Sequence, residues 1–319
     1  MGLRILYAGS PEPACETLKL LFENQNKYGF EIVGVLSNPP SAKGRHKDLI
    51  PTPVAAFAQE KSLPVFTPEH LDAAAREEVS QVKADLLVCF AYGHIFGPKF
   101  MALFKLGGIN LHPSLLPKYR GCSPVPAAIL NQDNQTAVTI QTLSPKMDEG
   151  DILAQTIIDL NKNETSESLL HDSAVIGAEL ICGILKTTSE KNILPQGKKQ
   201  EGQASYTGMI SKNDAKINWS ESAASIEAKI RAYFPEPGCW TSFNNEPLKL
   251  LKAEVIPDTQ NYQDKKNGQV LDYIKNQGII IKTGKDLLCV KKLQRQGKNP
   301  MEYKDFMNGA RNFVGTILQ

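Results

Sequence analysis

The stretch RILYAGSPEPACETLKLLFENQNKYGFEIVGVLS, residues 4–37, places a helical pattern between two apolar runs. The runs at residues 4–8 and 31–37 are rich in aliphatic side chains, as strands buried on both faces usually are. Between them, PACETLKLLFENQ (13–25) repeats apolar residues at helical spacing. A strand, a helix and a second strand in this order predict a parallel β-α-β unit.

The same alternation continues through the first half of the chain. Three more strand-like runs are ADLLVCFA (84–91), GGINL (107–111) and AVTIQTL (137–143), and PTPVAAFAQEK (51–61) is a second helical pattern. Together they predict an α/β fold with a doubly wound, mostly parallel sheet. Ligands of such a sheet bind at the carboxyl ends of its strands.

The second half of the chain differs in composition and in its apolar pattern. SESLLHDSAVIGAELICGILKTTSE (166–190) predicts a long amphipathic helix packed on the sheet, and the polar residues that follow have linker composition. From about residue 209, short strand-like runs separated by glycine turns predict a small antiparallel β-barrel of the oligonucleotide-binding type. We therefore expect a first domain over 1–190, a linker over 191–208 and a second domain over 209–319.

The composition is that of an ordinary globular protein, with 41% hydrophobic and 22% charged residues. No apolar run approaches the roughly 20 residues of a membrane helix, and the six cysteines form no Cys-x-x-Cys pair. We expect a cytoplasmic protein with reduced thiols and neither a membrane partner nor a metal. Residues 209–319 carry 17 Lys and Arg against 12 Asp and Glu, a net charge of +5. That surplus suits an anionic partner and, equally, a solvated surface.

The turn after the first run argues against a nicotinamide dehydrogenase. Of the three glycines in a dinucleotide fingerprint only Gly9 is present, and Pro11 and Pro13 occupy the turn. Without the second glycine the backbone cannot approach a pyrophosphate closely. A phosphate-binding Gly-x-x-x-x-Gly-Lys-Ser/Thr loop is also missing from the sequence.

Asn110 and His112 lie two residues apart at the end of GGINL, so on an extended strand their side chains point to the same side. Taken alone, they are more typical of polar groups that anchor a loop. A third polar residue, Asp148, lies in the turn SPKMDEGDIL (144–153), where it can face the same cleft.

These three residue types suit acyl transfer to an amine. The amide and the imidazolium can stabilise an oxyanion, while the carboxylate orients the imidazole and accepts the amine's proton. The sequence has neither a Gly-x-Ser-x-Gly elbow nor a metal-spaced histidine pair. Direct transfer, without a covalent enzyme intermediate, is therefore favoured.

INLHPSLLPKYRG (109–121), followed about 25 residues later by KMDEGDIL (146–153), resembles the signature of the 10-formyltetrahydrofolate-dependent formyltransferases. The resemblance implies a Rossmann-like catalytic domain, 10-formyltetrahydrofolate as formyl donor, and catalytic roles for Asn110, His112 and Asp148. It also implies folate binding in SLLP and in CFAYGHIF (89–96), whose backbone would receive the pterin ring. The implied folate-binding residues are Ser114, Leu115, Leu116, Pro117, Ala91, Tyr92 and Gly93.

Two further segments resemble the branch of this family that formylates methionyl initiator tRNA. NPPSAKGRHKDLIPTPV (38–54) is similar to its basic loop, and SYTGMISKNDAKINWSESAASIEAKIRAYFPEPG (205–238) is similar to its entry into a tRNA-binding C-terminal domain. The resemblance implies tRNA contacts by Lys43, Arg45 and Lys47. The loop departs from the family pattern: one arginine is lost, an acid replaces a lysine, and Lys43 is gained.

On this interpretation the product is N-formylmethionyl-tRNA for translation initiation, and we expect a monomer. Two alternatives stay open. A formyltransferase acting on an amino-sugar nucleotide can carry the same first domain, although such enzymes typically lack the basic loop. A folate or RNA binder with a decayed site would keep the fold, although the intact Asn110, His112 and Asp148 argue against it.

Overall fold

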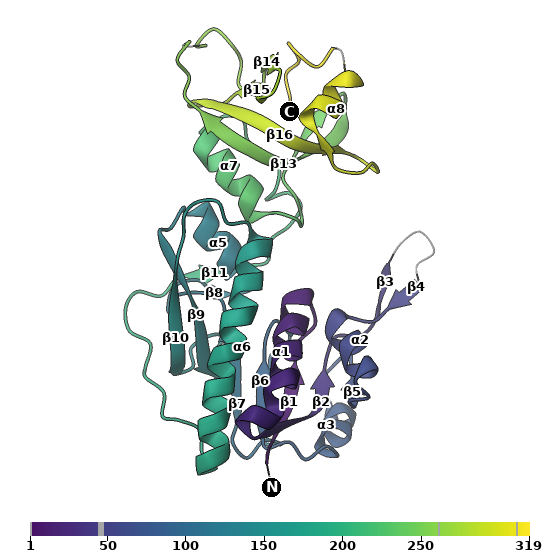
Figure 1. The fold of residues 1–319 in the computed structure, drawn as a ribbon, viewed down its shortest axis with the longest axis vertical. Coiled ribbons are helices and arrows are strands. Elements are labelled where there is room, and N and C mark those ends of the chain that lie inside the picture. The colour runs from purple at the N-terminus through teal and green to yellow at the C-terminus, as the bar shows by residue number, and fades with distance from the viewer. Residues whose placement is uncertain (1, 44–47, 261, 311) are drawn as a thin grey trace. The chain divides into compact units, whose positions relative to one another are not determined.

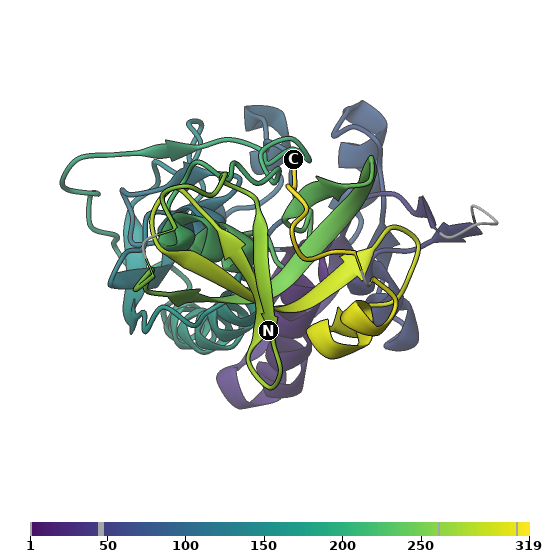
Figure 2. The same ribbon diagram turned by 90° about the horizontal axis from the view of Figure 1, so that it is seen from above.

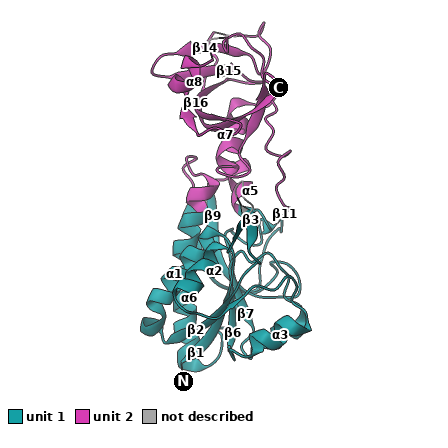
Figure 3. Cartoon of the chain, turned by 90° about the vertical axis from the view of Figure 1, so that its right-hand side faces the viewer, with its two compact units in different colours: residues 1–124, 135–159, 170–207 teal, residues 125–134, 160–169, 208–319 magenta. Residues whose placement is uncertain are grey.

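The computed structural model describes residues 2–43, 48–260, 262–310 and 312–319. The chain divides into two compact units, which Figure 3 draws in two colours. The first unit comprises residues 1–124, 135–159 and 170–207, and the second comprises residues 125–134, 160–169 and 208–319.

A seven-stranded mixed sheet forms the centre of the first unit (Figure 1). In chain order its strands are β1 (Leu3–Ala8), β2 (Phe30–Leu36), β5 (Val65–Phe66), β6 (Leu86–Cys89), β7 (Gly108–His112), β9 (Gln135–Thr142) and β10 (Ile152–Asp159). Across the sheet they run β10-β9-β7-β6-β1-β2-β5. The first five in chain order pair in parallel, while β9 and β10 are antiparallel at one edge. This confirms the predicted doubly wound, mostly parallel sheet.

Helices cover both faces of this sheet. They are α1 (Glu12–Tyr28), α2 (Pro53–Glu60), α3 (Ala73–Ser80), α4 (Pro98–Met101) and α6 (Ser166–Lys191). One core cluster joins the strands to α1, α2 and α6, and a second joins them to α3 and α4. Figure 3 shows α1 and α6 on one side of the sheet and α3 on the other. The strands are therefore buried on both faces, which explains their continuous apolar runs.

Helix α6 is, among the residues that the structure describes, the one helix long and apolar enough to cross a membrane by length and composition. Half of its apolar stretch is buried inside the fold, and Ile181 and Leu185 belong to the core. At Gly177 an added Cβ would lie 2.0 Å from Leu111 Cδ1, so the glycine lets α6 lie against β7. These features are those of a core helix.

The second unit contains an antiparallel half-barrel sheet and several helical segments, among them α5 (Pro124–Leu130). Its elements are α7 (Ala223–Ala232), β12 (Trp240–Phe243), β13 (Glu246–Ile256), β14 (Val270–Ile274), β15 (Gly278–Lys282), β16 (Leu287–Arg295), β17 (Met301–Glu302) and α8 (Tyr303–Asn308). The sheet order is β12-β13-β16-β15-β14, with β17 paired to β16. Figure 2 shows its long green and yellow strands. The small antiparallel barrel predicted for the C-terminal domain is confirmed as an antiparallel half-barrel sheet.

Two small two-stranded sheets lie outside these large ones. β3 (Ser41–Lys43) pairs antiparallel with β4 (Asp48–Ile50), and β8 (Arg120–Gly121) pairs in parallel with β11 (Tyr206–Thr207). Since β8 follows β7 closely and β11 lies 86 residues further along the chain, this second pair ties a distant segment to the end of β7.

Candidate active site

Strand β7 places Asn110 and His112 at its carboxyl end. Asn110 pairs with Cys89 of β6 on one side and with Gln141 of β9 on the other. Because side chains alternate along a strand, Asn110 and His112 share one face of the sheet, while Leu111 points to the opposite face and meets α6. The two predicted residues therefore lie together where ligands of such sheets bind.

The His112 ring is buried, with only 4% of the residue exposed. Its Nε2 lies 2.9 Å from the Tyr119 carbonyl oxygen, and its Nδ1 lies 3.6 Å from Oδ1 of Asp148. A carbonyl oxygen only accepts, so Nε2 carries the hydrogen and the neutral ring presents an unprotonated Nδ1 to Asp148. Burial lowers the pKa of His112, and this effect outweighs the raising effects of Asp148 and of the Tyr119 carbonyl. Burial therefore favours the neutral form of the ring.

Asp148 sits in a tight turn, where its φ of 54° lies in the left-handed region. Its Oδ1 accepts a hydrogen bond from Nε2 of Gln141 (2.9 Å), and its Oδ2 accepts one from the backbone N–H of Gly121 (2.8 Å). The turn needs Gly150, because a Cβ there would lie 1.7 Å from the Thr142 carbonyl oxygen. These constraints aim the Asp148 carboxylate at His112.

Asn110 completes the group from the neighbouring position on the sheet. It is half-buried, and its side-chain amide makes no hydrogen bond to another residue within the described part of the chain. Its cross-strand neighbour Gln141 holds Asp148, so Asn110 lies on the sheet beside the residue that positions the Asp148 carboxylate. An uncommitted amide donor beside a neutral imidazole and a carboxylate can stabilise an oxyanion and move a proton.

Two family models match the chain. A model described as "Formyl transferase" matches residues 3–183, and one described as "Formyl transferase, C-terminal domain" matches residues 209–311. The chain belongs to the formyltransferase family.

Relatives of this formyltransferase match it along nearly its whole length. A protein named methionyl-tRNA formyltransferase from Treponema denticola is 45% identical, over 98% of each chain. The solved structure of HypX from Aquifex aeolicus in complex with tetrahydrofolic acid has a TM-score of 0.67 at 14% identity, covering 98% of this chain and 48% of that one. Methionyl-tRNA formyltransferase from Clostridium thermocellum has a TM-score of 0.58 at 18% identity, covering 80% of this chain and 94% of that one. At these identities the solved structures show the fold alone.

The SLLP segment of the formyltransferase forms a tight turn after His112. Ser114 is fully buried, and its hydroxyl donates to the Lys118 carbonyl oxygen (2.7 Å). Its own carbonyl oxygen accepts a hydrogen bond from Oγ1 of Thr139 (2.7 Å). Leu116 and Pro117 are buried as well, so Leu115 is the half-exposed member of the segment. The Ser114 hydroxyl thus shapes the turn.

The Ala-Tyr-Gly segment follows the end of β6. Ala91 and Gly93 are exposed and have φ values of 51° and 89°, while Tyr92 is 2% exposed and stacks on Phe96 at a ring distance of 5.5 Å. The Tyr92 carbonyl oxygen accepts a hydrogen bond from Nδ2 of Asn38 (3.2 Å). A buried aromatic ring therefore anchors a short stretch of open backbone.

The basic loop lies between β3 and β4. Lys43 is the last residue of β3, whereas Arg45 and Lys47 lie outside the described residues. The predicted tRNA contacts of Lys43, Arg45 and Lys47 stay predictions.

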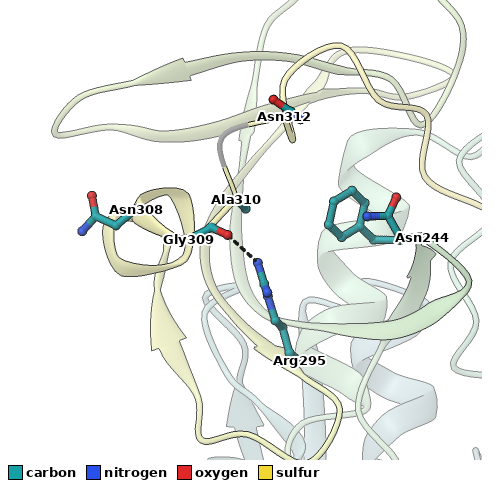
Figure 4. Close-up of a pocket in the computed structure, with 7 residues that line it drawn as sticks. Asn244, Arg295, Asn308, Gly309, Ala310 and Asn312 are labelled. Atoms are coloured by element: carbon teal, nitrogen blue, oxygen red, sulfur yellow. Dashed lines mark hydrogen bonds between the residues drawn. The ribbon is translucent and has the colours of Figure 1, made fainter.

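The second unit has a pocket of about 400 Å³ at the edge of its sheet (Figure 4). Among the described residues its lining includes the asparagines Asn244, Asn308 and Asn312 and the cation Arg295. The Arg295 guanidinium lies 4.7 Å from the Phe306 ring centre and donates to the Gly309 carbonyl oxygen at 3.5 Å. In the described part of the pocket, the Arg295 guanidinium thus lies among several amide groups.

Sequence reasoning missed three residues that support Asp148. Gln141, Arg120 and Gln200 all belong to a hydrogen-bonded network around its turn. A signal existed only for Gln141, which is a polar side chain with 1% exposure inside the apolar run AVTIQTL.

Proposed function

We propose that Asn110, His112 and Asp148 are the catalytic residues with which this formyltransferase transfers a formyl group to the α-amino group of methionyl initiator tRNA. The reaction gives N-formylmethionyl-tRNA for translation initiation. The observation that carries the assignment is the 3.6 Å approach of His112 Nδ1 to Asp148 Oδ1 on the face that Asn110 shares. The acceptor is supported by the 45% identity to a methionyl-tRNA formyltransferase over 98% of both chains.

The three side chains divide the chemistry between them. The amine nitrogen must be neutral to bond to the formyl carbon, and it loses a proton as the bond forms. Nδ1 of neutral His112 accepts that proton, and the resulting imidazolium faces the Asp148 carboxylate. Asn110 donates its amide N–H to the formyl oxygen while negative charge develops there. When the bond from the formyl carbon to the donor nitrogen breaks, His112 returns its proton to that nitrogen, so the protons balance.

The formyl donor is folate-derived, and we propose 10-formyltetrahydrofolate. The flat, polar pterin ring needs backbone donors and acceptors beside an apolar wall, and two segments provide them. Ala91 and Gly93 expose their backbone next to the buried Tyr92. Leu115, half-exposed in a turn fixed by Ser114, offers an apolar contact. We propose that the remaining SLLP residues, Leu116 and Pro117, support this apolar contact.

We propose that tRNA contacts the basic loop with Lys43, Arg45 and Lys47, and also the second domain over residues 209–319. Contacts to phosphate dominate the affinity of proteins for nucleic acids. The net charge of +5 in residues 209–319 supports this assignment, as does the Arg295 pocket with its asparagine amides, which can meet phosphate and base edges. We also propose that the protein acts as a monomer in the cytoplasm, where initiator tRNA is used.

A comparison of acceptors tests the proposed function. The protein is given 10-formyltetrahydrofolate together with either initiator Met-tRNA or an amino-sugar nucleotide, and formylated product is measured. We expect product with Met-tRNA alone, because the whole-length relatives bear that activity in their names. Formylation of the sugar alone, or tRNA binding without turnover, would show that the proposal is wrong.

A further inference from the structure

Residues 198–207, here called the strap, run along the first unit next to the Asp148 turn. The strap begins at Lys198, whose backbone exchanges two hydrogen bonds with Ile152 of β10. It ends in β11, which pairs with β8. The strap has the composition of a linker, yet its backbone makes regular contacts beside the candidate active site.

Gln200 is the strap residue that reaches the turn. Its Nε2 lies 2.8 Å from the carbonyl oxygen of Asp148, 2.8 Å from that of Gly150 and 3.2 Å from Oε1 of Gln141. An amide nitrogen has two hydrogens, so these three acceptors share them. One side chain thus spans the turn on both sides of Glu149 and also contacts the glutamine that holds the Asp148 carboxylate.

Arg120 fixes the other end of the Gln200 amide. Its Nε and Nη2 donate to Oε1 of Gln200 at 3.2 and 2.8 Å. The same guanidinium pairs with Oε1 of Glu149 at 3.1 Å and donates to the Tyr206 hydroxyl at 3.0 Å, and its side chain is only 12% exposed. With its Oε1 occupied in this way, the Gln200 amide has one orientation, with its hydrogens toward the turn.

The turn needs such support. Asp148 adopts a left-handed backbone conformation that side chains other than glycine seldom take, and residues keep such conformations when their surroundings hold them there. The carboxylate must also keep its short distance to His112, and catalytic rates fall steeply when a group is misplaced by about 1 Å.

We propose that Gln200 is a positioning residue for formyl transfer: its amide, held by Arg120, fixes the Asp148–Gly150 turn so that the Asp148 carboxylate faces His112. This inference rests on the proposed function, because it assigns Gln200 a role only through Asp148.

Three variants of the full chain test the proposal. Gln200→Ala removes the whole amide. Gln200→Glu keeps an acceptor for Arg120 but removes the hydrogens that hold the turn. Gln203→Ala is the matched control, since Gln203 is an exposed glutamine of the same strap.

The first measurement is the single-turnover rate of formyl transfer to Met-tRNA. We expect Gln200→Ala and Gln200→Glu to slow it by about 10- to 100-fold, with the KM for Met-tRNA changed by less than about threefold, and Gln203→Ala to match the wild type. In protein that already carries Asp148→Asn, Gln200→Ala should lower the single-turnover rate by less than about a further twofold. Wild-type rates in Gln200→Glu, or a full additional loss in the Asp148→Asn background, would overturn the proposal.

The second measurement is the NMR titration of His112 in protein labelled with ¹⁵N-histidine. The chain has five histidines, and the His112→Gln variant identifies the signal. Asp148 raises the pKa of His112 against the lowering effect of burial. A displaced carboxylate should therefore lower that pKa further in Gln200→Ala, and the Gln203→Ala titration should follow the wild type. An unchanged His112 titration in Gln200→Ala would overturn the proposal. The titration needs no acceptor, so this result would hold even if the wild type formylates an acceptor other than Met-tRNA.

Discussion

Replacing His112 by glutamine is expected to lower the single-turnover rate of Met-tRNA formylation by about 10²- to 10⁴-fold, the range for loss of a general acid–base group. The glutamine amide can still donate to the Tyr119 carbonyl oxygen, as Nε2 of His112 does, so the turn keeps this hydrogen bond. What is lost is the proton acceptor that faces Asp148. A rapid-quench experiment with saturating enzyme and formyl donor measures the rate of this transfer step directly.

The surface pair of His171 and Glu16 gives a matched control. Nδ1 of His171 lies 2.7 Å from Oε1 of Glu16, but the imidazole is 61% exposed and lies on α6, which packs on the face opposite Asn110 and His112. His171→Gln should leave the formylation rate unchanged. Equal rates in His112→Gln and His171→Gln would contradict a proton-transfer role for His112.

Replacing Asp148 by asparagine should slow the same step by about 10²- to 10³-fold, while the KM for Met-tRNA changes little. An asparagine oxygen can accept from either Gln141 or Gly121, but its NH₂ group would meet the other donor. The variant also removes the negative charge that stabilises the His112 imidazolium. Since Asp148 raises the pKa of His112, its loss should lower that pKa further.

Asp151, three residues along the same turn, serves as the control for Asp148. Its Oδ1 pairs with Nζ of Lys199 at 2.9 Å, and the side chain is 32% exposed. Asp151→Asn should change the formylation rate by less than about twofold, as exposed ion pairs contribute little. If Asp148→Asn and Asp151→Asn lowered the formylation rate by a similar factor, the cause would be general damage to the turn. The Asp148 charge would then have no specific role.

The fold could be predicted from the sequence where burial leaves a periodic pattern. The apolar runs at residues 4–8, 31–37 and 84–91 predict their strands, because a strand covered by helices on both faces carries apolar side chains throughout. AVTIQTL predicts a strand but not its direction, since the apolar pattern is the same for parallel and antiparallel pairing. The structure shows that it pairs antiparallel with β7.

The candidate site could be predicted only in part. The two-residue spacing of Asn110 and His112 places both on one face of β7, and the turn after the next apolar run contains Asp148. The support of Asp148 by Gln200 joins residues 52 positions apart. Gln200 lies in a polar stretch without periodicity, so only the folded chain reveals which glutamine reaches the turn.

The central claim is that His112 and Asp148 act as one proton-transfer unit in formyl transfer to Met-tRNA. A double-mutant cycle of His112→Gln and Asp148→Asn, followed by single-turnover formylation, tests it most directly. We predict that the doubly substituted protein is slower than the slower single variant by less than about threefold, because groups that act together are lost together. A rate reduced by the product of the two single effects would contradict the claim.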